Sequence, residues 1–126
     1  AQLDNAIRTQ GILPNPSAGL QEVVAVEGPG CFISANLVRQ GDDQGVTVVQ
    51  LEIDGQFVVN RSIEALINAG ATSINTFGVM VQRSGALNSV TIGFPEPLFF
   101  SDSLVLSATV GGAGIAQLFG EVITAE

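Results

Sequence analysis

The sequence lacks four residue types that carry much of protein chemistry: histidine, lysine, tryptophan and tyrosine. Their absence excludes a Ser-His-Asp triad, an imidazole metal site, a Schiff-base lysine and a tyrosine acid–base group. Its four basic residues are scattered along the chain, at Arg8, Arg39, Arg61 and Arg83. Affinity for nucleic acid comes largely from clustered Lys and Arg, so we expect no nucleic-acid partner.

Cysteine and long apolar runs are also scarce. Cys31 stands alone, which excludes an intrachain disulfide, a zinc cluster and a CxxC motif. No run of about 18 apolar residues exists, so we expect no membrane-spanning helix. Residues 1–5 lack the positively charged start of a secretory signal, although the sequence does not say whether a leader was removed.

What the chain does have is an excess of apolar over charged residues. Its 126 residues suit one domain, and 46% of them are hydrophobic while only 13% are charged, with a net charge of −8. Soluble domains usually carry about 25% charged residues. We therefore expect part of the surface to be apolar.

From Leu20 onward, short apolar alternations separated by Gly- and Asp-rich turns predict β-strands. The fold class predicted is all-β: an eight-stranded antiparallel sandwich, jelly-roll-like, with one short helix and an N-terminal arm; a closed barrel is the alternative. The helix is expected between Asn60 and Gly70, which have capping character. The eight strands are expected at residues 20–27, 31–39, 45–53, 56–60, 73–82, 88–94, 103–110 and 115–124, with a loop at 95–102.

The first 19 residues differ from this pattern. Leu3, Ala6 and Ile7 share a helical face, and residues 11–19 then bring two prolines and two glycines that interrupt regular structure. We therefore divide the chain into an arm at 1–19 and a β-sandwich domain at 20–126. A frayed terminus is the alternative for the arm.

The Asp54-Gly55 turn allows a prediction of register. A two-residue hairpin would pair Glu52 with Phe57 and mix polar with apolar side chains on one face. A three-residue loop, with Gly55 left-handed in a bulge, would instead pair Leu51 with Phe57. The bulged loop is predicted, with a positive φ at Gly55 and not at Asp54.

Once each strand's inner face is assigned, several apolar residues remain on outer positions or in the 95–102 loop. Sheet curvature, the helix or the arm would cover some of them, but burial between subunits is the favoured explanation. These residues are Phe32, Val48, Met80, Phe99, Phe100, Val105, Phe119 and Ile123. The predicted interface consists of Phe32, Met80, Phe99, Phe100, Val105 and Phe119.

Acidic residues are the remaining candidates for chemistry. Asp42 and Asp43, in a Gly-flanked loop, offer oxygen ligands for calcium, but a solvated turn is the favoured interpretation because the spacing is not that of an EF-hand. A carboxylate pair for glycoside hydrolysis usually lies beside aromatic side chains that stack on the sugar. This chain has no Trp or Tyr to form such a surface. No catalytic residue, cofactor or metal is predicted.

Two segments carry a resemblance to a known family. The hairpin at residues 51–58 and the proline-aromatic segment at 97–106 resemble those of small β-sandwich proteins of tailed-phage virions, of the head-decoration or fibre-associated type. The resemblance implies a non-enzymatic virion protein, trimeric, attached to a capsid or tail through an arm or one end of the sandwich. The Lys-rich outer strands familiar in that family are missing.

The leading hypothesis is thus a structural, self-associating virion protein without catalytic activity, with another virion protein such as the capsid protein as partner and no membrane contact. The alternative is an extracellular module that binds a carbohydrate or a protein, since loops at one end of a sandwich commonly carry recognition. A hydrolase using paired acids is a third possibility, which a cleft lined by two carboxylates would support.

Overall fold

The computed structural model describes residues 7–41, 47–68, 79–84, 87–112 and 114–125. These residues form nine strands and one short helix. The elements are β1 (Ile7–Pro14), β2 (Gly19–Glu27), β3 (Gly30–Gly41), β4 (Val48–Ile53), β5 (Gln56–Ser62), α1 (Ile63–Asn68), β6 (Val79–Ser84), β7 (Leu87–Phe100), β8 (Ser103–Val110) and β9 (Ile115–Ala125).

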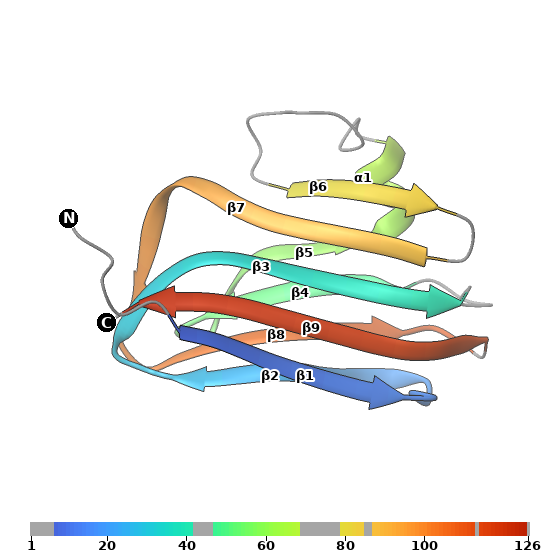
Figure 1. Cartoon of the computed structure of the whole chain (residues 1–126), viewed down its shortest axis with the longest axis horizontal. Helices are drawn as coiled ribbons and strands as arrows, with labels where there is room; N and C mark the ends of the chain where they lie inside the picture. Colours follow the sequence, from blue (N-terminus) through green and yellow to red (C-terminus); the bar gives the residue numbers. More distant parts are fainter. Residues whose placement is uncertain (1–6, 42–46, 69–78, 85–86, 113, 126) are drawn as a thin grey trace.

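The strands form two packed antiparallel sheets, so the predicted all-β sandwich is confirmed and the closed barrel is not. Sheet A has the order β1-β9-β3-β7-β6, and sheet B has the order β2-β8-β4-β5. Figure 1 shows sheet A in front of sheet B. The pairs β1·β9, β2·β8, β3·β7 and β4·β5 nest inside one another along the chain, which is the connectivity of a jelly roll. The extra strand β6 extends sheet A beyond β7.

The core lies between the sheets and is filled by alternate residues of the strands. Its largest fully buried side chains include Phe32, Phe100, Leu37, Leu51 and Leu104. The rings of Phe32 and Phe94 meet edge to face, with centroids 6.1 Å apart. Ile63 and Leu66 of α1 also belong to the core, and the Ser62 hydroxyl accepts a hydrogen bond from the Ala65 backbone N–H (3.0 Å), so the predicted helix is confirmed.

The segment expected to be an irregular arm contains a strand. β1 pairs with β9 from Ile7 to Pro14, so the expected break in regular structure is wrong at residues 11–14. Pro14 is tolerated because β1 is an edge strand, and Asn15, with a φ of 47°, turns the chain after it. β1 is the strand by which the structure exceeds the predicted eight; residues 1–6 lie outside the described range.

Glycine lets β1 and β9 approach sheet B closely. Gly11 and Gly120 are paired, and a Cβ on Gly11 would collide with the Val23 carbonyl oxygen. β2 has a register irregularity here, between Glu22 and Val24, and both Val23 and Val24 are buried. A side chain at position 11 would therefore force the two sheets apart.

The loop predicted at 95–102 is also wrong for most of its length, because β7 continues to Phe100. The register between β3 and β7 moves from Ser34↔Gly93 to Phe32↔Leu98, so residues 94–97 form a bulge opposite Ile33. Pro95 and Pro97 lie in this bulge, where no ladder hydrogen bond is required of them. The predicted turn persists only at Ser101 and Asp102.

The predicted register of the β4–β5 hairpin is wrong as well. Both Asp54 (φ 51°) and Gly55 (φ 83°) are left-handed, as in a two-residue type I′ turn. Glu52 pairs with Phe57, and the register then shifts so that Leu51 pairs with Val59. A bulge at Val58, one step beyond the turn, thus gives Leu51 an apolar partner, Val59, in place of the Phe57 that the three-residue loop was expected to provide.

Candidate functional site

Two of the six predicted interface residues lie in the core. Phe32 and Phe100 are 0% and 1% exposed, so the expectation that they are available to another subunit is wrong. Alternation along β3 places Phe32 outward, but the bulge at Ile33 changes its phase, and both Phe32 and Ala35 face inward. Phe100 packs against Gly30, where a Cβ would come within 2.9 Å of the Phe100 ring.

The other four residues are accessible, but the structure does not bring them together. Phe99 is 65% exposed, beside the β7–β8 turn at one end of the sandwich. Phe119 and Met80 are half-buried on the outer side of sheet A, whereas Val105 is half-buried on the outer side of sheet B. We therefore treat the two outer sides as separate candidate surfaces.

Face A is the outer side of sheet A, and its apolar centre is a row formed by Ile12, Phe119 and Val38. The register joins these three residues across β1, β9 and β3. Ile12 is 57% exposed, and the other two are half-buried. The residues of face A are Arg8, Gln10, Ile12, Ser34, Asn36, Val38, Gln40, Met80, Leu87, Ser89, Thr91, Gly93, Gln117, Phe119, Glu121 and Ile123.

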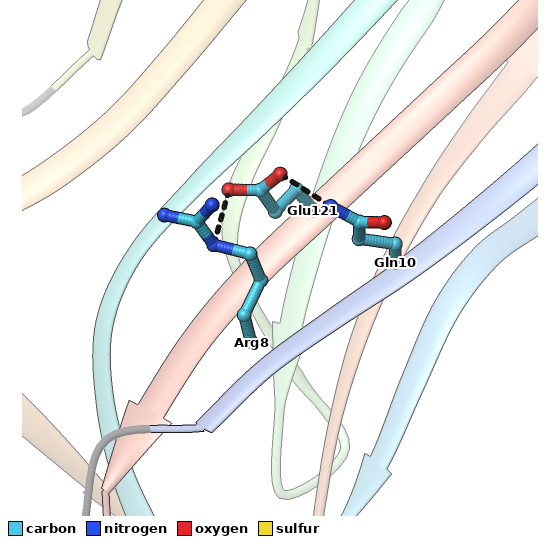
Figure 2. A network of polar contacts seen from close by, with 3 residues as sticks. All are labelled: Arg8, Gln10 and Glu121. Atoms are coloured by element: carbon cyan, nitrogen blue, oxygen red, sulfur yellow. Dashed lines mark hydrogen bonds and ion pairs between the residues drawn. The ribbon is translucent and has the colours of Figure 1, made fainter.

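The polar side chains of face A bond to one another along the sheet. Glu121 forms an ion pair with Arg8 (Oε1 to Nε, 3.0 Å) and accepts a hydrogen bond from the Gln10 amide (3.0 Å), as Figure 2 shows. The Ser89 hydroxyl donates to the Asn36 side-chain oxygen (2.9 Å). Among the described side chains of face A, Arg8 and Glu121 are the charged ones, and their charges cancel.

Face B, the outer side of sheet B, differs in charge. Its described side chains include three glutamates, Glu22, Glu27 and Glu52, and none of its described side chains is basic. Its polar residues also bond laterally, because Thr109 donates to Gln50 (2.9 Å) and Gln50 donates to Asn60 (3.3 Å). The residues of face B are Leu20, Glu22, Ala25, Glu27, Val48, Gln50, Glu52, Phe57, Asn60, Ser62, Ser103, Val105, Ser107 and Thr109.

Asp54 joins two turns at the end of the sandwich that carries Phe99. Its carboxylate accepts hydrogen bonds from the backbone N–H groups of Ser101 (2.9 Å), Asp102 (2.8 Å) and Ser103 (3.1 Å). These bonds, that from Ser101 first, lower the pKa of Asp54 below its ordinary value. Sequence reasoning placed Asp54 in a turn but missed this role, which depends on the distant 101–103 segment.

A buried polar group lies toward the opposite end. Arg39 is 3% exposed, and its Nη1 donates to the Thr47 hydroxyl (2.9 Å). Asn88, paired with Arg39 between β3 and β7, is fully buried. Arg39 therefore takes part in internal packing rather than in a basic surface.

Asp42 and Asp43, the candidate calcium ligands, lie outside the described residues. Within the described ranges, no group of three or more His, Cys, Asp or Glu residues is arranged to hold a metal ion. The described part of the chain also contains no helix long and apolar enough to cross a membrane.

Comparison with known proteins yields a structural similarity and none in sequence. No protein-family model matches the chain, and no curated protein matches its sequence. The fold is similar to that of a chain in the acid-stable capsid structure of Helicobacter pylori bacteriophage KHP30, with a TM-score of 0.56 and 11% sequence identity. The match covers 99% of this chain and 90% of the other. At this identity, the similarity concerns the fold.

Proposed function

We propose that this chain is a structural, self-associating protein of a virus particle, of the decoration or fibre-associated type, that attaches to a larger assembly and has no catalytic activity. The observation that carries the proposal is the jelly-roll match along nearly the whole length of both chains to a chain of a phage capsid structure. The phage resemblance of the 51–58 and 97–106 segments supports it independently of that match.

The apolar surface supports the self-association. Ile12, Leu20, Phe57 and Phe99 are each more than half exposed, in a chain with few charges to cover its surface. Burial of apolar area contributes roughly 25 cal/mol per Å² to association before the cost of ordering is subtracted. The virion resemblance implies three copies in the assembly.

The end of the sandwich that carries Phe99 is the proposed point of attachment to the capsid or tail protein. Phe99 is the most exposed large apolar side chain described, and Asp54 holds the neighbouring 101–103 turn in place. A rigid turn beside an exposed aromatic ring is the kind of anchor that dominates binding energy at interfaces.

The test is to produce the tagged chain in cells infected with the virus that encodes it and to purify the particles on a density gradient. A virion component remains at a constant ratio to the major capsid protein through a high-salt wash. Absence from purified particles would contradict the proposal. Binding to a specific sugar on a glycan array, together with that absence, would favour the extracellular module, because jelly rolls also occur in lectin domains.

The attachment point is tested by Phe99→Ser with Leu20→Ser as its control. Leu20 is nearly as exposed as Phe99, at 63% against 65%, but it lies near the start of β2, at the opposite end of the sandwich. We expect Phe99→Ser to reduce the amount of chain on purified particles at least tenfold, as loss of an aromatic anchor does. Equal incorporation of both variants would place the attachment elsewhere.

A further inference from the structure

Charge decides which surface can meet a second copy of this chain. Each copy carries a net charge of −8, so two copies repel one another unless they meet where charges are absent or cancelled. On face A the described charged residues are Arg8 and Glu121, which neutralise each other. Face B would bring three glutamates from each copy together with no basic residue of that face between them.

Several polar groups of face A would keep hydrogen-bonding partners if water were removed from the face. Burying a polar group is costly when its hydrogen-bonding capacity is left unmet. Glu121 already has Arg8 and Gln10 as partners, and Asn36 accepts from Ser89, all within the face. A second copy laid over face A would therefore leave these lateral bonds intact.

The size of face A matches what a stable contact needs. The 11 residues of β9 span about 37 Å and four strand spacings span about 19 Å, which gives a projected area of about 700 Å². A standard interface buries about 800 Å² on each partner. Face B is smaller, because the 8 residues of β8 and three spacings give only about 400 Å². In Figure 1 no described helix or strand crosses in front of sheet A.

We propose that a second copy of this chain docks on face A, face against face, with Ile12, Phe119 and Val38 at the centre of the contact. One surface that meets itself is related by a twofold axis, so the unit formed is a dimer and not the trimer implied by the family resemblance. The Arg8 guanidinium is suited to such a contact: the Arg8 side chain is 61% exposed, and the ion pair with Glu121 that Figure 2 marks is made by Nε. The terminal nitrogens of Arg8 can then donate to a carboxylate of the second copy.

The experiment compares the same substitution on the two faces. Val38→Glu and Val105→Glu each add one negative charge at a half-buried outer position of an interior strand, β3 in sheet A and β8 in sheet B. Sedimentation velocity of the full chain, from micromolar to millimolar concentration, should give the parent and Val105→Glu proteins twice the mass of 13.0 kDa. Val38→Glu should dissociate, with a dimer Kd raised about a hundredfold by the unpaired carboxylates in the contact.

Thr91→Glu provides a second test of face A in case Val38→Glu fails to fold. Thr91 is an exposed face A residue on β7, so a glutamate at this position should not disturb folding. Circular dichroism melts show that each variant is folded, and Thr91→Glu should also weaken the dimer. This inference rests on the proposed self-association, and the experiment separates the failure of one from the failure of the other. A parent protein that stays monomeric overturns both the self-association and the docking through face A. A trimer, or an assembly that Val38→Glu and Thr91→Glu leave intact, overturns face A docking alone.

Discussion

The outer sides of the two sheets differ in how they deal with charge. On face A, Glu121 is held by Arg8 and Gln10, whereas on face B the glutamates Glu22, Glu27 and Glu52 have no basic residue of that face beside them. Both sheets present a row of laterally bonded polar side chains, so polarity alone does not distinguish them. The difference in net charge makes face A a surface that tolerates burial and face B one that favours solvent.

Face A depends on β1, which supplies Arg8, Gln10 and Ile12. Deleting residues 1–14 removes this strand and exposes the edge of β9, whose pairing with β1 covers eight residues. We expect loss of the cooperative melt in circular dichroism and aggregation in size-exclusion chromatography. Deleting only residues 1–6 keeps β1 and should leave the melt intact.

If the protein lacking residues 1–14 melts cooperatively and still forms dimers, the contrast between face A and face B fails. Face A would then not require its edge strand. This result would also support the interpretation of the first residues as an arm. The expected result follows from the full-length pairing of β1, which residue composition alone had not indicated.

The inner and outer sides of sheet A should respond to different extents to the same small substitution. Gly11→Ala places a methyl group against the backbone of Val23 and should lower the free energy of unfolding by about 3 kcal/mol. Gly93 lies on the outer side, where an added Cβ would meet no atom within 4 Å, so Gly93→Ala should change stability by less than about 0.5 kcal/mol. Urea denaturation measures both; equal effects would mean that the sheets do not approach closely at Gly11.

The sequence predicted most strands because period-two alternation is local. It could not predict where the alternation changes phase. The strands shift register near Val23, Ile33 and Val58, and nothing in the local sequence indicates these bulges. The bulge at Ile33 moves Phe32 from the surface to the core. β1 was missed because Gly11 and Pro14 normally end regular structure, and only pairing with β9 reveals that an edge strand accommodates them.

The candidate surface was predicted only in part for the same reason. The outward positions of Phe119 and Met80 follow from local alternation, and the structure places both on face A. The pairing of Arg8 with Glu121 joins residues at opposite ends of the chain. Neither this pairing nor the location of Glu22, Glu27 and Glu52 on face B can be derived before the strand order is known.

The end of sheet B should be sensitive to acid through Asp54. Asp54→Asn retains a residue that tolerates a positive φ but replaces one carboxylate oxygen with a donor facing backbone N–H groups. We expect the melting temperature at neutral pH to fall by roughly a few degrees. Because the pKa of Asp54 is lowered in the folded state, its contribution is complete above the unfolded value near 3.8 and is lost as pH falls through the folded value.

The difference in melting temperature between parent and Asp54→Asn should therefore begin to shrink below about pH 4, where Asp54 of the unfolded parent takes up a proton, and should disappear at lower pH, where the folded parent is protonated as well. Comparing the two proteins at each pH removes the effect of the carboxylates they share. A difference that stays constant down to the lowest pH would show that the carboxylate charge does not stabilise the 101–103 turn.

The smallest effect tests the contrast between the faces most directly. Glu121→Gln and Glu52→Gln each remove one negative charge with little change in shape. On face A, the substitution weakens the contact with Arg8 and should cost about 0.5 kcal/mol, since the Arg8 side of the pair is largely exposed. On face B, it relieves repulsion by Glu22 and Glu27 and should stabilise by a few tenths of a kcal/mol. Urea denaturation of dilute protein measures both, and added salt should reduce both through screening. Effects of the same sign would mean that the two faces do not differ in charge balance, and the electrostatic reason for docking through face A would be lost.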